Sequence, residues 1–382
     1  MLHSSLRRPA VRCFLVLIVV GFCWSIYTQH AWEDYYITYR ASKNLATGHG
    51  LTFTVGERVH SFTSPLGVLL PALASLLTAN SSDGAALWIF RAMSIAAVAG
   101  AGVFLWRLGT AFFSQRISAV LLVALFATDA KIVDFSTNGM ETGLLLFFLS
   151  WTLHTLWTWT TVARPCVQLG CAWAGLMWTR PDSFIYIGAQ AVGTILVRPA
   201  LARSESRWIL LKRYLSAGLL TTALYLPWLI WAWRYYGSPI PHTIVAKGLF
   251  NERTTMASLG HAIWQFPAAV MGNRALLTTT FMPPYSFNTG WPAAALHSSF
   301  WIALGVLVTW LLPRVRPEAR IASFAFFIGH FYLSAFVGFP VPWYLQTVTL
   351  FALFVVSSVV DQTLNVSRPM LRPAVLGSAG LL

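Results

Sequence analysis

The feature that most constrains this chain is a series of ten apolar runs separated by polar segments. Their approximate bounds are 13–28, 86–106, 117–134, 141–162, 166–179, 183–197, 214–233, 297–312, 321–338 and 343–360. A helix of about 20 apolar residues crosses the hydrocarbon core of a bilayer and satisfies its backbone hydrogen bonds internally. Charged residues make up only 10% of the chain, against about 25% in soluble domains. The sequence therefore predicts an all-α polytopic membrane protein, with about ten transmembrane helices in a single membrane domain over residues 1–382.

The basic residues test this count, because short cytoplasmic loops are rich in Lys and Arg. With Arg7, Arg8 and Arg12 inside, ten spans place every strongly basic short loop on one side. These loops are 107–116, 163–165, 198–213, 313–320 and the tail 361–382. We therefore interpret the net charge of +14 as a topology signal rather than as nucleic-acid binding. No small-residue cleavage site follows the first run, so we expect an uncleaved anchor and a cytoplasmic N-terminus.

A further apolar segment, 65–79, is too short to cross a bilayer, and counting it as a span would reverse several basic loops. Ser64 is a suitable N-cap and Pro65 suits the first helical position, so we expect a helix at the outer interface. The runs 166–179 and 183–197 are also short. The sequence leaves open whether each of them crosses fully.

The outer face receives most of the irregular polar sequence, so we expect the functional site there. Its segments are the loops 29–85 and 234–296 and the turns 135–140, 180–182 and 338–342. We find no phosphate-binding loop, dinucleotide fingerprint or zinc-protease motif, and the four cysteines lack metal-ligand spacing. The sequence predicts no metal site and no disulfide framework, and it leaves open whether a divalent cation takes part.

Three carboxylates of this face are candidates for catalysis, in a chain with 12 acidic residues. Glu33 and Asp34 follow the first span directly, and Glu141 opens the fourth. A carboxylate at such a place can act as a base on a substrate bound at the membrane surface. The structural alternatives are that Glu33 and Asp34 favour the positive end of a helix over 34–46, and that Asn138 and Glu141 form a capping box.

Four basic side chains are candidates for contacting a phosphate headgroup: Arg91, Arg180, Lys247 and His242. Arg91 lies inside an apolar run, where an arginine either faces a cavity or partner or extends to the interface. Arg180 and Asp182 also fit a structural role at the ends of two successive helices. His242 and Lys247 lie in an aromatic stretch near the membrane surface, where they suit a phosphate.

Other side chains of the outer face are candidates for contacting the rest of a substrate. They are Arg40, Tyr36, Tyr236, Trp343 and Tyr344. By helical spacing, Arg40 lies on the same side of its helix as Glu33. Aromatic residues at membrane edges are also common as interfacial belts, which is the alternative for Trp343 and Tyr344. The stretch 52–59 predicts a small hairpin.

The motifs of the outer face occur in the order found in a known family. Residues 33–59 contain Glu-Asp-Tyr-Tyr-Ile-Thr-Tyr-Arg, Asn-Leu, Gly-His-Gly-Leu and Gly-Glu-Arg-Val. Asn-Gly-Met-Glu-Thr (138–142), Thr-Arg-Pro-Asp (179–182), a Tyr-Gly to Pro-His-Thr to Lys series (236–247) and Pro-Trp-Tyr (342–344) follow. This ordered set resembles the GT-C integral-membrane glycosyltransferases, in particular the branch that includes bacterial terminal arabinofuranosyltransferases. The resemblance covers most of residues 30–350.

The resemblance implies an enzyme of the bacterial inner membrane, working on the periplasmic or extracellular face. It would transfer a sugar from a polyprenyl-phosphate donor to a glycan or lipid-glycan acceptor, with membrane lipids around it. We expect inversion at the anomeric carbon, with Glu33 or Asp34 taking the acceptor proton and Glu141 orienting the acceptor or tuning the pair. The phosphate leaving group needs charge neutralisation, for which Arg91, Arg180 and Lys247 are candidates.

The chain departs from the family pattern at three points. Glu33 stands where the family usually has Asp, which leaves open which acid is the base, and His242 replaces a common Asn. Family members often carry a soluble domain after the last span, whereas this sequence ends at Leu382. An acceptor-binding region is missing, or the protein is a short form or a fragment.

Two other classes of protein remain as alternatives to an enzyme. They are a lipid-linked sugar transporter and a non-catalytic partner in an envelope assembly complex. Transporters place ionisable groups near the membrane midplane, often between repeated halves. Convergence of the outer carboxylates and basic groups on one cavity would favour the enzyme.

Overall fold

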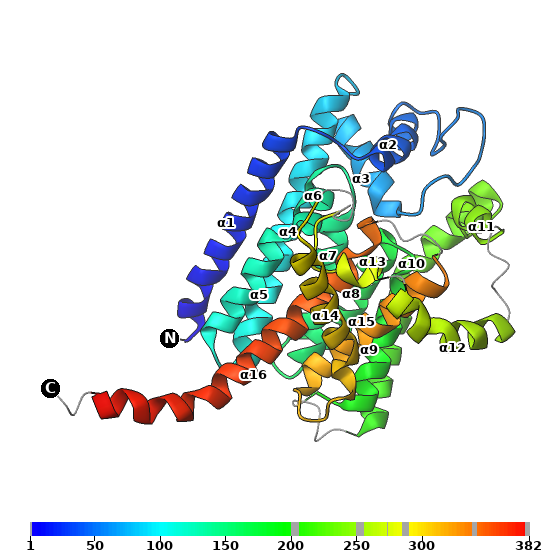
Figure 1. The fold of residues 1–382 in the computed structure, drawn as a ribbon. Coiled ribbons are helices and arrows are strands. Elements are labelled where there is room, and N and C mark those ends of the chain that lie inside the picture. Colours follow the sequence, from blue (N-terminus) through cyan, green and yellow to red (C-terminus); the bar gives the residue numbers. More distant parts are fainter. Residues whose placement is uncertain are drawn as a thin grey trace.

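A computed structural model describes residues 2–199, 206–249, 256–272, 274–284, 290–337 and 342–378 of the chain. Within these ranges the fold is helical and contains no strand (Figure 1). A longer helix occupies each of the ten predicted runs: α1 (Leu2–Thr28), α4 (Asp83–Phe112), α5 (Arg116–Thr128), α7 (Thr142–Trp157), α8 (Pro165–Thr179), α9 (Ser183–Val197), α10 (Arg207–Tyr236), α14 (Ala293–Val308), α15 (Pro317–Ala335) and α16 (Gln346–Ser378). The all-α prediction is therefore confirmed.

Five helices of the described part are long and apolar enough to cross a membrane. They cover Arg8–Thr28, Asp83–Phe112, Arg207–Tyr236, Ala293–Leu311 and Gln346–Val366, the fourth of these including the 3-10 helix η3 (Thr309–Leu311). The helices α5, α7 and α9 are apolar but shorter. The chain is thus an integral membrane protein, and the exact number of its spans stays a prediction.

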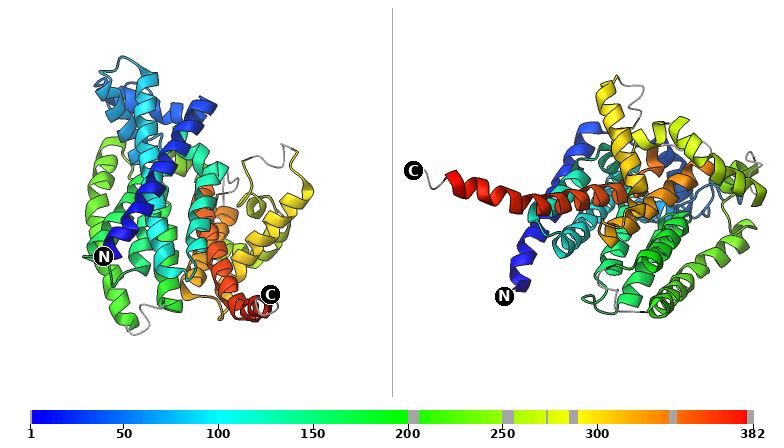
Figure 2. Two further views of the ribbon diagram at one scale, coloured as in Figure 1. Left: turned by 90° about the vertical axis from the view of Figure 1, so that its left-hand side faces the viewer. Right: turned by 60° about the horizontal axis from the view of Figure 1, so that its bottom comes forward.

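The longer helices pack side by side into one bundle (Figure 2). α4 contacts α1 and α7, α8 contacts α7 and α10, and α15 contacts α9 and α16. One continuous core of buried apolar side chains joins them. Gly143 allows α7 to cross α4 closely, because a Cβ at this position would lie 2.5 Å from the carbonyl oxygen of Ser94.

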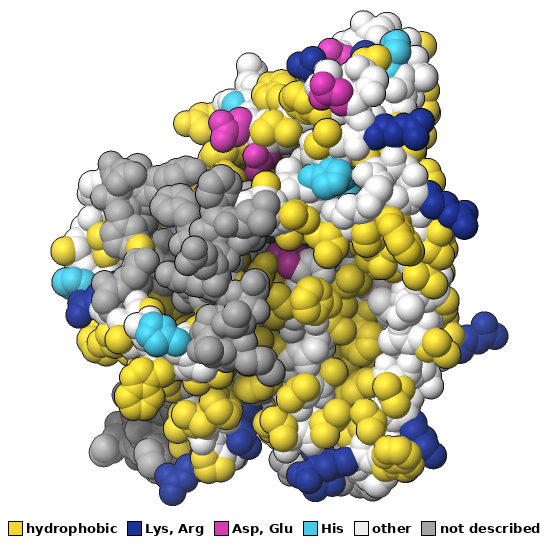
Figure 3. All heavy atoms as spheres, turned by 90° about the vertical axis from the view of Figure 1, so that its right-hand side faces the viewer, with side chains coloured by type: hydrophobic (Ala, Val, Ile, Leu, Met, Phe, Trp, Pro, Cys, Tyr) yellow, Lys and Arg dark blue, Asp and Glu magenta, His cyan; other side chains and the backbone are white. Residues whose placement is uncertain are grey.

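Short helices and turns gather at one end of the bundle, which we call the polar end. They are α2 (Glu33–Ala46), α3 (Pro65–Leu77), α6 (Ala130–Thr137), the turn between α8 and α9, and the 3-10 helix η4 (Pro342–Tyr344) (Figure 1). Figure 3 shows acidic side chains towards this end together with several basic ones, hydrophobic side chains below, and further basic side chains along the opposite edge. The orientation that the basic loops predict stays a prediction.

Both short helices predicted near the polar end are present. In α3, the Ser64 hydroxyl accepts a hydrogen bond of 2.8 Å from the Gly67 amide, so the predicted N-cap is confirmed. In α2, the C-cap is Thr47, and Gly48 follows with a φ of 84°, a conformation that favours glycine. Three more helices lie in the loop 234–296: α11 (His242–Leu249), α12 (Met256–Gly272) and α13 (Ala275–Thr278).

The hairpin predicted over 52–59 is wrong, since this stretch contains no strand. Side chains of α2 bind the backbone that a hairpin would pair. The Asn44 amide donates to the Thr52 carbonyl at 2.8 Å, and Arg40 Nε donates to the Phe53 carbonyl at 3.1 Å. The loop is therefore fixed to α2 rather than folded on itself.

Two predicted runs differ from the helices in their bounds. The run 117–134 is not one helix, because Asp129 ends α5 and its side chain caps α6 by accepting from the Ile132 amide at 3.0 Å. The run 141–162 ends early, at Trp157. The charges of Asp129, Lys131 and Asp134 inside an apolar run were the sequence signal for this break.

Candidate active site

The start of α2 is docked on the turn between α6 and α7, which brings two of the predicted carboxylates to one place. The Trp32 amide donates to the Asn138 carbonyl at 3.0 Å. Gly139 has a φ of 92°, and a Cβ there would lie 2.8 Å from the Tyr35 ring. The Asn-Gly pair therefore allows α2 to approach this turn closely. As a result Asp34 and Glu141 face the same region.

A third acid, Asp134, holds this arrangement from behind. Its carboxylate is buried and accepts hydrogen bonds from the indoles of Trp24 at 2.9 Å and Trp32 at 3.0 Å. It also accepts from the side-chain amide of Asn138. Asp134 thus ties the end of α1 and the segment before α2 to α6, a role that the sequence reasoning missed.

The structural interpretation of Glu141 as part of a capping box is wrong. Asn138 ends α6 instead of starting α7, and Glu141 is the N-cap of α7 without a side-chain capping bond. Its carboxylate Oε1 lies 3.9 Å from Arg180 Nη1. A Cβ on Gly67 would lie 3.5 Å from the other oxygen, Oε2, so Glu141 also borders the N-terminal turn of α3.

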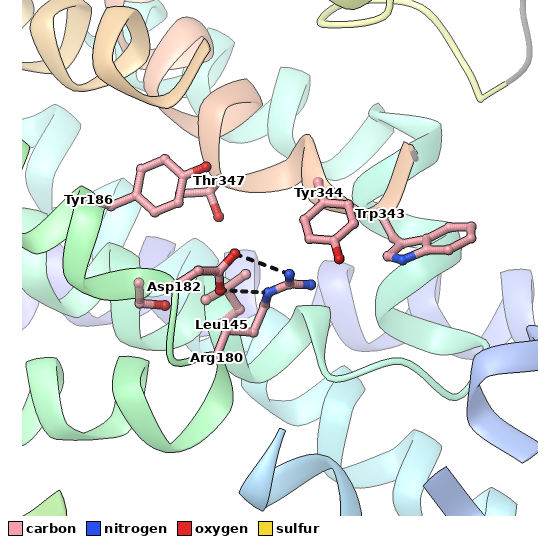
Figure 4. Close-up of a pocket in the computed structure, with 8 residues that line it drawn as sticks. Leu145, Arg180, Asp182, Tyr186, Trp343, Tyr344 and Thr347 are labelled. Carbon is pink, nitrogen blue, oxygen red and sulfur yellow. Dashed lines mark hydrogen bonds and ion pairs between the residues drawn. The ribbon is translucent and has the colours of Figure 1, made fainter. Parts of the chain in front are cut away.

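Arg180 ends α8 and stands at the centre of this charge cluster. Its Nε and Nη2 donate to the two carboxylate oxygens of Asp182, at 3.1 and 3.2 Å (Figure 4). Its guanidinium lies over the ring of Tyr344, 4.4 Å from the ring centroid. Asp182, the N-cap of α9, makes no side-chain capping bond, and its carboxylate pairs with Arg180 instead.

A small pocket opens beside Arg180 (Figure 4). Its lining residues are Leu145, Arg180, Asp182, Ser183, Tyr186, Trp343, Tyr344 and Thr347. They come from α7, the turn between α8 and α9, α9 itself, η4 and the start of α16. The free space holds about one water molecule, so a sugar or phosphate group requires the pocket to open.

The surrounding charges shift the protonation of Glu141. Burial raises the pKa of this carboxyl, and the charge of Arg180 opposes the rise. The negative charges of Asp34 and Asp182 add to the rise, which also shows that Asp34 is close enough to interact. The charges of Asp182 and Glu141 hold the pKa of Arg180 well above its ordinary value, against the effect of burial. Arg180 therefore stays a cation, and Glu141 takes up a proton more readily than an exposed glutamate does.

The two adjacent acids of the first loop differ in their surroundings. Asp34 is half-buried and interacts with Glu141, whereas the side chain of Glu33 is exposed. Tyr36 and Arg40 are also exposed, and the guanidinium of Arg40 lies 4.8 Å from the centroid of the Phe53 ring. Arg40 thus binds the loop that follows α2 rather than reaching the pocket.

Arg91 is buried but belongs to a different environment. Its Nη2 donates to the carbonyl of His30, and its guanidinium lies over the Trp88 ring at 4.7 Å. Arg91 is 3% exposed and its guanidinium binds protein groups, and whether it extends to the membrane interface stays a prediction. The structure joins Arg91 to the segment that links α1 to α2 and does not place it in the lining of the pocket.

Tyr236 and His242 form a separate cluster with His60. The His60 amide donates to Nδ1 of His242 at 3.0 Å, and the His242 amide donates back to the His60 carbonyl at 3.0 Å. The rings of His60 and Tyr236 stack at 4.5 Å, and the Tyr236 hydroxyl donates to the Leu51 carbonyl at 2.5 Å. These bonds fasten the start of α11 to the first outer loop. The side chain of Lys247 lies outside the described residues.

Trp343 and Tyr344 both line the pocket, and Trp343 also packs on α6 and the segment before α2. Its ring lies 6.3 Å from that of Trp32 and 6.1 Å from that of Phe135. In the described part of the chain, no group of three or more His, Cys, Asp or Glu side chains has the arrangement of a metal site. The cluster thus consists of Arg180 with Glu141 and Asp182 beside it, and of Asp34, which interacts with Glu141, at the polar end of a membrane bundle.

The fold is that of an integral membrane protein with a cluster of charged side chains at the polar end of its helices. Among solved structures, the Archaeoglobus fulgidus oligosaccharyltransferase has a similar fold. The match has a TM-score of 0.52 and 13% identity, and covers 92% of this chain and 50% of that one. At this identity the similarity concerns the fold alone. No family model matches the chain.

Two curated relatives extend the similarity to sequence. The chain is 30% identical over 336 residues to a terminal beta-(1->2)-arabinofuranosyltransferase of Corynebacterium glutamicum. It is 29% identical over 269 residues to the protein of the same name from Mycobacterium tuberculosis. These alignments cover 80% and 64% of this chain, but only 43% and 39% of the relatives. The chain thus spans less than half the length of these relatives. The similarity in sequence to these relatives, and in fold to the oligosaccharyltransferase, agrees with the resemblance to the GT-C integral-membrane glycosyltransferases.

Proposed function

We propose that the chain transfers a sugar from a polyprenyl-phosphate donor to a glycan or lipid-glycan acceptor, at the external face of the membrane and with inversion of the anomeric carbon. The observation that carries this proposal is the convergence of Asp34, Glu141 and Arg180 at the polar end of an apolar bundle. The names of the two relatives support a sugar as the transferred group.

The proposed donor fits the division of the molecule into apolar helices and a polar end. A polyprenyl tail would lie among the lipid-facing helices, and its phosphate would reach the pocket that Arg180 lines. Charge builds up on the phosphate oxygen as the bond to the sugar breaks, and a fixed arginine stabilises such charge. Phosphate is a weak base, so its departure needs this neutralisation more than it needs a proton.

The acceptor hydroxyl must lose a proton as it attacks the anomeric carbon. Asp34 is the favoured base, since it is half-buried and interacts with Glu141, whereas Glu33 is exposed. Burial raises the pKa of Glu141, and the negative charge of Asp34 adds to the rise, so Glu141 holds a proton more readily than an exposed glutamate does. Glu141 would then tune the base and orient the acceptor.

The direct test is release of polyprenyl phosphate from a panel of polyprenyl-phosphate sugars by the purified chain, supplied with an acceptor extract. We expect release with one donor sugar. Glu141→Gln should lower the rate at least tenfold, because positioned acid–base groups contribute about 10²–10⁴-fold. Glu57→Gln is the matched control, since Glu57 is exposed on the same outer loop.

Two results would contradict the proposal. One is the absence of release with every donor from protein that is folded by its thermal transition. That result would favour a lipid-linked sugar transporter or an activity that needs the part of the relatives this chain does not span. The other is a Glu141→Gln variant as active as Glu57→Gln, which would remove the assigned site.

A further inference from the structure

Asp182 occupies one whole edge of the Arg180 guanidinium. The two hydrogen bonds, Nε to Oδ1 at 3.1 Å and Nη2 to Oδ2 at 3.2 Å, form a parallel pair (Figure 4). A bidentate pair of this kind fixes the plane and the direction of a guanidinium, which a single contact does not. Asp182, two residues further along the chain, therefore holds Arg180 in one orientation.

The same guanidinium lies over the ring of Tyr344, with Cζ 4.4 Å from the ring centroid, so the ring limits its movement. With Nε and Nη2 bonded to Asp182, Nη1 is the guanidinium nitrogen that makes no hydrogen bond within the described part of the chain. Its nearest charged group is Oε1 of Glu141 at 3.9 Å, which is beyond hydrogen-bond distance. Arg180 thus has a directed donor that is not fully used by the residues around it.

Asp182 is itself fixed by its surroundings. It is separated from Arg180 only by Pro181, whose ring restricts the backbone of the turn. Tyr332, from α15, lies close enough to the Asp182 side chain to interact with it. Two helices and a proline therefore set the position of the carboxylate before any substrate arrives.

We propose that Asp182 is a positioning residue that orients Arg180, so that Nη1 is presented to an oxygen of a phosphate group. The inference rests on the proposed function only for the identity of that phosphate as part of a polyprenyl-phosphate donor. Without the carboxylate, the two-nitrogen edge of Arg180 is free to turn to Glu141. The phosphate then competes with a closer Arg180–Glu141 pair.

The negative charge of Asp182 acts in the opposite sense, because it repels a phosphate. This repulsion is the smaller effect, since Asp182 lies on the edge opposite Nη1 and Coulomb energy falls with distance and with solvent screening. The orientation of a charged donor, in contrast, decides whether a short charge-assisted bond forms at all. Removing the charge of Asp182 should therefore weaken phosphate binding.

The test uses the full chain in detergent and measures binding of farnesyl phosphate, with farnesol as the ligand that lacks the phosphate. We expect Asp182→Asn to weaken farnesyl phosphate binding about tenfold, a difference of about 1.4 kcal/mol, with farnesol unchanged. Asp182→Glu keeps the carboxylate and should recover part of the loss. In the transfer assay, the KM for the donor should rise about tenfold while kcat changes less than about threefold.

Wild-type binding of farnesyl phosphate by Asp182→Asn would overturn the inference, and so would equal weakening for farnesol. Tyr332→Phe serves as a second variant if Asp182→Asn does not fold, and a smaller loss of the same kind is expected. If it leaves farnesyl phosphate binding unchanged, the inference fails. Wild-type protein that prefers farnesyl phosphate to farnesol, yet transfers no sugar, would contradict the proposed function and leave this inference standing.

Discussion

At the scale of single residues, the charge balance of the site favours a proton on Glu141. Arg180 interacts with Glu141 and Asp182, and Asp34 interacts with Glu141, so the group is negative when all three acids are ionised. A phosphate approaching such a cluster is repelled. Burial raises the pKa of Glu141, so this acid takes up a proton more readily than an exposed glutamate does. A proton on Glu141 would reduce the repulsion when a donor binds.

Gly139→Ala tests the docking of α2 at this scale. The φ of 92° is unfavourable for alanine, and its Cβ would lie 2.8 Å from the Tyr35 ring. We expect a loss of about 1–3 kcal/mol in the free energy of unfolding, and a fall in activity as Asp34 moves from Glu141. Thermal unfolding in detergent together with the release assay measures both effects.

Gly188→Ala is the matched control for this substitution. Gly188 lies inside α9, and a Cβ added there would meet no other atom within 4 Å, so alanine should be neutral or slightly stabilising. If Gly139→Ala behaves like Gly188→Ala, the close contact between α2 and the α6–α7 turn does not hold the site together.

At the scale of elements, the first outer loop and α11 are held together by reciprocal bonds between His60 and His242. His60 is buried and stacks on Tyr236 at the end of α10. Burial, and next the charge of His242, lowers the pKa of His60 to about 4. This contact links two segments that are 182 residues apart in sequence.

The contact predicts a specific pH dependence of stability. The folded state keeps His60 neutral down to about pH 4, whereas in the unfolded chain a histidine takes up a proton near pH 6.5. His60 stabilises the fold fully above pH 6.5, and this contribution is lost as the pH falls from 6.5 to 4, by up to about 3 kcal/mol. Thermal unfolding across this range measures it.

His60→Phe is the variant that isolates this effect, because it keeps an aromatic ring against Tyr236 and removes the titrating group. We expect its stability to fall less than that of the wild type between pH 6.5 and 4. Parallel pH profiles for the two proteins would mean that other groups cause the loss.

At the scale of the whole molecule, apolar periodicity and basic loops were enough to predict the helical class and the positions of ten longer helices. The caps of α3 and the end of α2 followed from local residue chemistry at Ser64 and Gly48. Long-range pairing was beyond this reasoning. Asn138 and Glu141 match a capping box in sequence, but Asn138 ends α6 and Glu141 faces Arg180, which is decided by how α8 packs on α7.

Only part of the candidate site could be predicted, again because long-range pairing is not visible in the sequence. The sequence singled out Asp34, Glu141 and Arg180, but could not separate them from Arg40 and Arg91. Those two arginines bind backbone carbonyls of neighbouring loops, a use that depends on the tertiary fold. Asp182 was interpreted as a helix-end charge, because the geometry of its pair with Arg180 is not visible in the sequence.

The measurement that tests the central claim most directly is the rate of polyprenyl phosphate release by Asp34→Asn compared with Glu33→Gln. These two residues are adjacent in sequence and lie in the first turn of the same helix, but Asp34 interacts with Glu141 whereas Glu33 is exposed. We predict that Asp34→Asn lowers the rate by about 10²-fold or more, and that Glu33→Gln stays within about threefold of the wild type. Loss of activity in Glu33→Gln with Asp34→Asn unaffected would contradict the account of the site.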